Sequence, residues 1–317
     1  MKVRRALTAT IGAAVLMGVA ACGGGDDPLA EDDNEGGGGD KGSVVISGQD
    51  FVESAIMAEM YDQVLTAEGY SVEQKLVDTR DIYFDQLSKG SVDIVPDYLA
   101  GIGDYLNIQA NGANAKPITT NSPDESLDAI TPLAKEAGIT LLQPAEAANQ
   151  NGYAVTEDFA KENNLETLSD LGKLDQPITL AAAPDCEERM DCAKGLKQVY
   201  NIEIDKVLPL GFGGAPTRNS VEDGESDLAQ FGTTDASVED AGLVFLEDDK
   251  GLQPAQNLTP AVNTEFLEEN PDVADTLNEL SAQVTTDDLM ELNHQAGSER
   301  VAVPDVVSEY LNDSGLM

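Results

Sequence analysis

Hydrophobic and polar residues alternate along the first part of the chain in a way that predicts strands and helices in turn. Short apolar runs rich in β-branched residues at 44–47, 72–77 and 92–95 predict strands. Between them, apolar pairs recur every four positions over 56–65 and predict a helix with one buried face, and 79–88 predicts a second helix. This β-α-β-α-β order predicts a parallel, doubly wound sheet.

The same alternation returns after a clear helix start. Ser122 is a favourable N-cap, Pro123 suits the first helical position, and Glu125 is placed to close a capping box. Further strands are expected at 139–142, 153–155, 178–182, 207–210 and 243–246. Residues 265–316 have helical patterns. We therefore predict two α/β units of about 100 residues each, followed by a helical tail.

Charge and composition exclude several classes of function. The chain has 317 residues, 41% of them hydrophobic, and its 18 Lys and Arg against 59 Asp and Glu give a formal charge of -41. Nucleic-acid binding and adhesion to anionic lipid need basic surfaces, so both are disfavoured. The single histidine, His294, argues against an imidazole base beside a nucleophile and against zinc sites with paired histidines. No phosphate-binding motif occurs, and we interpret the Gly-rich segment 211–214 as a turn.

The N-terminus predicts export. Lys2, Arg4 and Arg5 precede an uncharged apolar run over 6–21. This run is shorter than the roughly 20 apolar residues that a membrane-spanning helix needs. We therefore interpret 1–21 as a cleaved secretory signal peptide.

Cys22 directly follows this signal. Residues 19–22 (VAAC) resemble the lipobox of bacterial lipoproteins, in which the cysteine is lipidated and becomes the first mature residue. The acidic, Gly-rich segment 22–42 suits a flexible tether to such an anchor. The sequence thus predicts an extracytoplasmic protein held on the cell membrane only by a lipid on Cys22. An ordinary signal followed by an incidental cysteine is the alternative.

Two further cysteines, Cys186 and Cys192, are separated by five residues. Outside the cytoplasm such a pair is expected to form a small disulfide loop, and two free buried thiols are the alternative. A metal site is disfavoured because neither a second cysteine pair nor a histidine accompanies them. We expect no cofactor.

Five segments then stand out together. They are ISGQDFVESAIMAEMY (46–61), TRDIYFDQLSKGSVDIVPDYLAG (79–101), NGYAVTEDFA (151–160), FGTTDASVED (231–240) and FLEDDKG (245–251). In order and spacing this set resembles the substrate-binding proteins of osmoprotectant ABC transporters, which are receptors for glycine betaine, choline, carnitine and proline betaine. The likeness extends from about residue 44 to the C-terminus.

The resemblance implies a fold and a function. The expected fold is a two-lobed, periplasmic-binding-protein-like (type II) clamp in which each lobe is a doubly wound α/β sheet flanked by helices. Lobe 1 would comprise 43–148 plus 247–317, and lobe 2 would comprise 149–246. The protein would be a monomeric receptor, not an enzyme, which closes on a quaternary ammonium ligand and presents it to the permease subunits of an ABC importer.

Such a ligand carries a trimethylammonium group, which cannot donate a hydrogen bond and is best held by aromatic rings. The chain has no Trp but eight Tyr, so Tyr and Phe must form the cage. Tyr98 follows a predicted strand, at the edge where open α/β sheets bind ligands, and Tyr153 matches a tyrosine of the family. Tyr83 and Phe51 are further candidates, with core packing as the alternative role for both, and packing under its loop is the alternative for Tyr98.

One wall of the cage departs from the family pattern. The family often has an aromatic residue immediately before the Ser/Thr-Thr-Asp motif, where this chain has Gly232. Phe231 lies one position earlier. Either Phe231 replaces the missing ring, or the pocket is wider here.

The polar part of the ligand would need its own partners. Arg189 stands where the family carries a carboxylate-binding arginine, although acidic neighbours make a surface ion pair the alternative. Gln49 stands where many relatives have a lysine. It can donate an amide hydrogen bond but carries no charge, so choline, which lacks a carboxylate, would be less disfavoured as a ligand than in those proteins. Thr79 and Thr234 are expected hydrogen-bond donors, whereas Asp235 is expected to orient backbone.

Two other functions remain open from the sequence. A receptor for another small solute, such as an amino acid or a polyamine, would use the same clamp. An exported hydrolase would need two carboxylates at a defined separation, and the sequence singles out no such pair.

Overall fold

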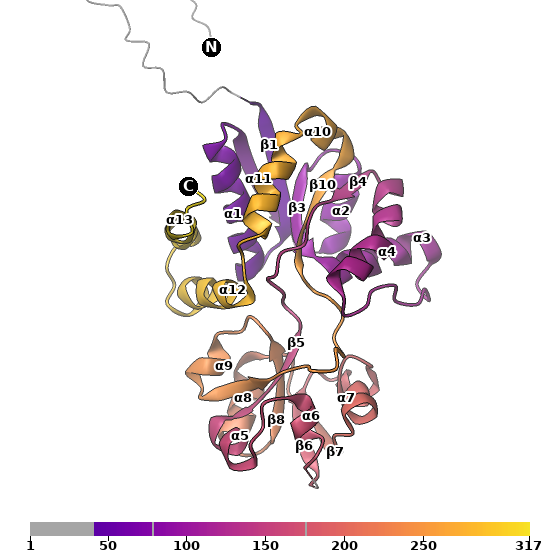
Figure 1. Ribbon diagram of the computed structural model, residues 1–317, viewed down its shortest axis with the longest axis vertical. Helices are drawn as coiled ribbons and strands as arrows, with labels where there is room; N and C mark the ends of the chain where they lie inside the picture. Colours follow the sequence, from indigo (N-terminus) through magenta and orange to yellow (C-terminus); the bar gives the residue numbers. More distant parts are fainter. Residues whose placement is uncertain (1–40, 78, 175) are drawn as a thin grey trace, which may run out of the picture. The chain divides into compact units, whose positions relative to one another are not determined.

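The computed structural model describes residues 41–77, 79–174 and 176–317 (Figure 1). The described residues all belong to one compact unit. The predicted signal peptide, Cys22 and the tether up to residue 40 lie outside the described residues. Within the described part, no helix is long and apolar enough to cross a membrane.

The first sheet has the strand order β2-β1-β3-β10-β4. Its strands are β1 (Ser43–Gln49), β2 (Ser71–Val77), β3 (Ile94–Tyr98), β4 (Ile139–Leu141) and β10 (Leu258–Asn263). β1 pairs in parallel with β2 and β3, whereas β10 runs antiparallel to β3 and β4. The strand predicted at 92–95 lies later, at β3. The sequence pattern did not predict β10, because all of its side chains are buried and it shows no alternation.

The second sheet repeats this topology with the order β7-β6-β8-β5-β9. Its strands are β5 (Asn151–Thr156), β6 (Ile178–Ala182), β7 (Ile204–Pro209), β8 (Leu228–Gly232) and β9 (Leu243–Leu246). β6 is parallel to β7 and β8, and β5 is antiparallel to β8 and β9. In each sheet the antiparallel strand is the first that the chain forms after crossing from the other sheet. The two crossing segments contact one another through a bridge between Ala148 and Asn257.

Helices cover both faces of each sheet. They are α1 (Val52–Ala67), α2 (Arg80–Ser88), α3 (Leu99–Asn111), α4 (Pro123–Glu136), α5 (Glu157–Asn163), α6 (Leu168–Leu171), α7 (Ala193–Tyr200), α8 (Gly214–Glu222), α9 (Ser237–Asp240), α10 (Thr264–Glu269), α11 (Asp272–Ser281), α12 (Thr286–Asn293) and α13 (Val303–Asp313). A 3-10 turn, η1 (Cys186–Glu188), precedes α7, and a π-helical turn, η2 (His294–Ser298), follows α12. The α4 start is confirmed, since Ser122 Oγ accepts from the backbone N–H of Glu125.

Each sheet is buried by two separate apolar clusters. On one face of the first sheet, α1, α11, α12 and α13 pack around Met57, Met60 and Leu277. On its other face, α2, α3 and α4 pack around Phe84 and Ile130 (Figure 1). The second sheet is covered in the same way, by α6 and α7 on one face and by α8 and α9 on the other. The doubly wound character of both halves is therefore confirmed, with one antiparallel strand in each sheet.

Candidate functional site

One cavity, of about 340 Å³, lies where elements of the two sheets meet. We call it the main cavity because the loops after β1 and β8 both line it, although cavities of about 550 and 520 Å³ occur elsewhere in the described part. The lining comes from the start of α1, a crossing segment, the end of β8 with α9, and the end of α12 with η2. Its residues are Phe51, Val52, Glu53, Asn149, Phe212, Gly232, Thr234, Asp235, Ala236, Ser237, Asn293, Gly297 and Ser298. Residues from both halves of the fold thus line one cavity, which is open to solvent, and a clamp requires such a shared site.

Strand ends explain why these residues meet. β1 ends at Gln49 and β8 ends at Gly232, so the loops that follow both strands lie at the carboxyl edges of the sheets, where open α/β folds bind ligands. Two aromatic rings are left unusually accessible there: Phe51 is 39% exposed and Phe212 is 53% exposed. Exposed aromatic rings on a cavity wall are suited to bind a ligand with an apolar or cationic surface.

Glu53 places a buried carboxylate in the same wall. The residue is 4% exposed and accepts hydrogen bonds from the Tyr98 hydroxyl, from Asn149 Nδ2 at 2.9 Å and from Asn293 Nδ2. Burial, reinforced by this carboxylate, raises the pKa of Tyr98, so the phenol keeps its proton and remains a donor. Tyr98 therefore contacts the site through Glu53.

The opposite wall is formed by the loop after β8. Thr234 is 3% exposed, and its backbone carbonyl accepts from Asn293 Nδ2 at 3.2 Å. Asn293 thereby connects the end of α12 with both Glu53 and the second-sheet half. Asp235 Oδ1 accepts from the backbone N–H of Ser237 at 3.0 Å, at the start of α9. Asp235 thus orients backbone as expected, and it also lines the main cavity.

The cage wall that was expected to depart from the family pattern, at Phe231 and Gly232, has no aromatic ring facing the main cavity. Phe231 is fully buried and packs edge to face on Phe245, with ring centroids 6.4 Å apart. Gly232 faces the main cavity, where a Cβ would lie 2.7 Å from Oδ1 of Asn149. A side chain at this position would displace the asparagine that binds Glu53. The cavity is therefore open on this side.

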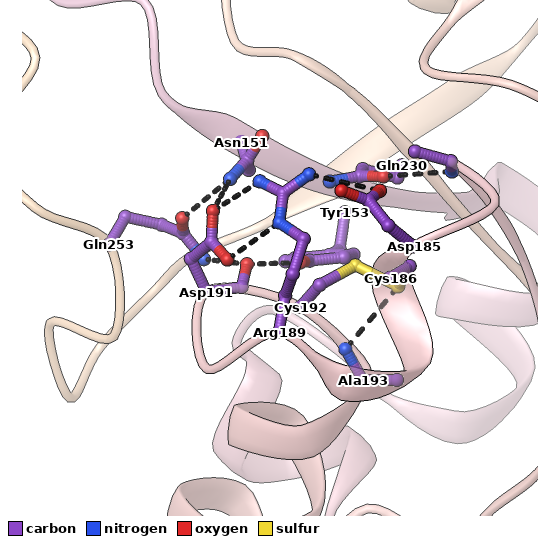
Figure 2. A network of polar contacts seen from close by, with 11 residues as sticks. Asn151, Tyr153, Asp185, Cys186, Arg189, Asp191, Cys192, Ala193, Gln230 and Gln253 are labelled. Atoms are coloured by element: carbon purple, nitrogen blue, oxygen red, sulfur yellow. Dashed lines mark hydrogen bonds and ion pairs between the residues drawn. A yellow bond between two sulfur atoms is a disulfide. The ribbon is translucent and has the colours of Figure 1, made fainter. Parts of the chain in front are cut away.

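Arg189 lies in an adjoining cavity of about 260 Å³, which shares Asn149 and Phe212 with the main cavity. Its guanidinium donates to both carboxylate oxygens of Asp191 and lies 3.4 Å from Asp185 (Figure 2). Burial raises the pKa of Asp191, but the bonds from Arg189 outweigh it, and the net result is a lowered pKa. The forked donor that was expected to hold a ligand carboxylate is thus paired with Asp191.

The loop that carries Arg189 is closed by a disulfide between Cys186 and Cys192. Tyr153 holds the same loop through a hydrogen bond. It is 1% exposed, lies in the apolar cluster of the second sheet, and donates from its hydroxyl to the backbone carbonyl of Asp191 at 2.8 Å (Figure 2). The ring of Tyr153 is therefore placed in the core, and its hydroxyl positions the partner of Arg189.

Three other predicted site residues lie outside both cavity linings. Tyr83 is 1% exposed and donates to Asp97 Oδ2 at 2.7 Å, so it packs in the core of the first half. Thr79 is an exposed residue that precedes α2, and Gln49 is a half-buried residue that ends β1. The structure does not bring these three together with Phe51 and Thr234 around the main cavity.

Sequence reasoning missed most of the cavity lining, including four side chains on which the chemistry of the site depends. Glu53 was one acid among many, Asn149 and Asn293 carry no periodic signal, and Phe212 was included in a segment interpreted as a turn. One sequence feature could have indicated Phe212: it is a large apolar residue flanked by glycines, which leave its ring exposed. Across the described residues, no group of three or more His, Cys, Asp or Glu side chains is arranged to hold a metal ion.

Comparisons with known proteins give a consistent result. A family model described as the substrate binding domain of ABC-type glycine betaine transport system matches residues 42–313. The chain is 27% identical to the glycine betaine-binding protein YehZ of Escherichia coli (strain K12) over 274 residues, which cover 83% of this chain and 88% of YehZ. It is 28% identical over 165 residues to the carnitine transport binding protein OpuCC of Listeria monocytogenes, covering 52% of this chain and 53% of OpuCC.

Comparison with solved structures points to the same group of proteins. A crystal structure described as glycine betaine/carnitine/choline ABC transporter superposes with a TM-score of 0.74 at 22% identity, covering 86% of this chain and 99% of that chain. The predicted two-lobed, periplasmic-binding-protein-like fold is confirmed. Proteins of this kind bind substrates for ABC transporters, which confirms the prediction that the chain is not an enzyme. With a match over most of its length, this chain belongs to the family of substrate-binding domains of ABC-type glycine betaine transport systems.

Proposed function

We propose that this protein is the extracytoplasmic receptor of an ABC importer and captures a quaternary ammonium osmolyte between its two lobes. Capture holds the lobes closed, and the closed form delivers the ligand to the permease. The family supports this function, and two relatives are named for glycine betaine and carnitine, which both carry a trimethylammonium group. The observation that carries the proposal is the pairing of exposed aromatic rings with a buried carboxylate in the main cavity.

The aromatic part of this proposed site consists of Phe51 and Phe212. Their rings are exposed in the cavity wall, whereas the ring of Phe231 is buried in the core of its sheet. A trimethylammonium group gains from the negative faces of such rings, at about 0.5 to 2 kcal/mol for each one. Tyr98 supports the cage indirectly, because its hydroxyl holds Glu53.

The lobes of this clamp would be 43–148 plus 247–317 and 149–246. The two five-stranded sheets, each assembled largely from one of these groups, support that division. We further propose that the signal 1–21 is removed and that a lipid on Cys22 anchors the receptor. Mass spectrometry of the exported protein is expected to find an acylated Cys22 at its N-terminus, and an intact residue 21–22 junction would contradict this anchor.

Calorimetric titration of the protein lacking residues 1–22 tests the ligand class. We expect glycine betaine, choline or both to bind with a Kd of about 1 μM or tighter, which corresponds to about 8 kcal/mol. Proline, which lacks a quaternary nitrogen with three methyl groups, is expected to give no heat of binding. Silence of both quaternary compounds would contradict the proposed function.

The same titration localises the cage when it is repeated on ring-deletion variants. Phe51→Ala and Phe212→Ala are each expected to weaken binding by about two- to thirtyfold, as the loss of one ring–cation contact implies. Ile82→Ala is the matched control, because Ile82 is a 44% exposed apolar residue outside both cavity linings. Equal affinity in the two Phe variants and the control would remove these rings from the site.

A further inference from the structure

Glu53 is a buried acid whose hydrogen-bond partners are all neutral. It is 4% exposed, and its donors are the hydroxyl of Tyr98 and the side-chain amides of Asn149 and Asn293. A buried carboxylate normally has a cationic partner, because desolvating an unpaired charge is costly. Among the described residues that line the main cavity there is no Lys, Arg or His, and Asp235 adds a second acid. The charge of this cavity is therefore incomplete without a cation.

The hydrogen bonds of Glu53 restrict what kind of cation completes it. Two donors occupy Oε1 and a third occupies Oε2, so most of the carboxylate's acceptor sites are already used. A primary ammonium or guanidinium group would compete with those donors for the remaining lone pairs. A quaternary ammonium group needs none, because its attraction to the carboxylate is purely coulombic. The network can therefore stay intact when such a cation enters.

The charges around the cavity also affect whether a ligand with a carboxylate group can bind. A carboxylate on the ligand would be repelled by Glu53 and Asp235 in the main cavity. The adjoining cavity offers Arg189, but both oxygens of Asp191 already occupy its forked donor groups. A zwitterionic betaine must therefore displace an existing ion pair or accept repulsion, whereas a monocation with a hydroxyl group meets neither cost.

We propose that Glu53 is the specificity-determining counter-ion of the site and that it makes the receptor prefer a quaternary ammonium monocation to a zwitterionic betaine. This inference rests on the proposed function, since it assumes that the main cavity holds the osmolyte. Choline is the monocation probe and glycine betaine is the zwitterion probe. The two share the trimethylammonium group, so their ratio of affinities isolates the contribution of the ligand's own carboxylate.

The test is a parallel titration of both probes into wild type, Glu53→Gln, Glu53→Asp and Glu59→Gln. Wild type is expected to bind choline at least about tenfold more tightly than glycine betaine, and Glu53→Gln is expected to lose at least about tenfold in that ratio. Glu53→Asp keeps the charge and should retain the preference. Glu59→Gln is the matched control, since Glu59 lies on the same helix, accepts from Gln63 and Gln74, and is outside the cavity lining.

Each outcome separates this inference from the proposed function. A merely structural role for Glu53 would weaken both probes equally and leave their ratio unchanged, which would overturn the inference. A wild-type preference for glycine betaine would overturn it as well, while leaving the proposed function in place. If wild type bound neither probe, both the inference and the proposed function would be overturned. Thermal unfolding of each variant, compared with wild type, shows whether the titrated protein is folded. Where Glu53→Gln is unstable, the wild-type ratio of affinities remains the readout, because a ratio below about tenfold in favour of choline would overturn the inference.

Discussion

Replacing Arg80 with methionine is expected to lower the free energy of unfolding by about 3 kcal/mol, because Asp97 is then left buried without its cation. Asp97 is 3% exposed, and Arg80 reaches it with Nε at 2.8 Å and Nη2 at 2.9 Å. Tyr83 also donates to this carboxylate, but a neutral phenol does not neutralise its charge. Removing one partner of a buried pair leaves the desolvation penalty of the other uncompensated.

Urea unfolding with Lys89→Met as the control checks this expectation. Lys89, which directly follows α2, pairs with Asp85 of that helix at 2.7 Å, but both side chains are more than half exposed. Losing that pair should cost only about 0.3 to 0.5 kcal/mol. If the two variants lost similar amounts of unfolding free energy, the burial of Asp97 would not explain how much the Arg80–Asp97 pair stabilises the protein.

This ion pair also bears on the site. Asp97 Oδ1 accepts from the backbone N–H of Tyr98 at 2.7 Å, so the pair fixes the end of β3 immediately before the residue that holds Glu53. A cost in stability at Arg80 is therefore expected to be accompanied by weaker ligand binding. The pair lies outside the cavity lining, which makes it a positioning element only.

The second large effect is expected at Tyr153. Replacement by alanine should lower the free energy of unfolding by about 3 to 5 kcal/mol, because a 1% exposed ring leaves a cavity in the core of the second sheet. Tyr153→Phe keeps the ring and removes only the bond to the Asp191 carbonyl, so about 1 kcal/mol is expected for that variant. Urea unfolding of both variants measures the difference.

Ligand binding distinguishes packing from a place in the cage. With its ring in the core, Tyr153→Phe is expected to bind choline and glycine betaine as wild type does. A Tyr153→Ala protein as stable as wild type, but with binding weakened by about tenfold or more, would instead assign this ring to the cage. The same logic applies to Phe231, which is fully buried.

Several features of the protein could be predicted without coordinates. The α/β alternation indicated most of the strands, and Ser122 with Pro123 indicated the start of α4. The set of ordered motifs indicated the family and, through it, the two-lobed fold. These features depend on residues that are close together in the chain or on the order of segments along it. Both can be read from a sequence without coordinates.

The orientation of each ring could not be predicted in the same way. Successive side chains of a strand point to opposite faces, so Gly232 faces the main cavity while Phe231, one residue earlier, faces the core. A pattern of apolar residues identifies a buried face but does not say whether a core or a cavity covers it. That distinction depends on pairing between distant segments, such as the antiparallel addition of β10 to β3.

The polar centre of the site depends on tertiary structure still more completely. Asn149 and Asn293 lie 96 and 240 residues after Glu53 in the chain. The three side chains meet only when α1, α12 and a crossing segment are in place. The sequence by itself determined the fold class, the family and an exceptional excess of acids. The tertiary structure alone decided which of those acids is buried in the cavity, because burial without a cationic partner is a property of the assembled surroundings and not of the residue.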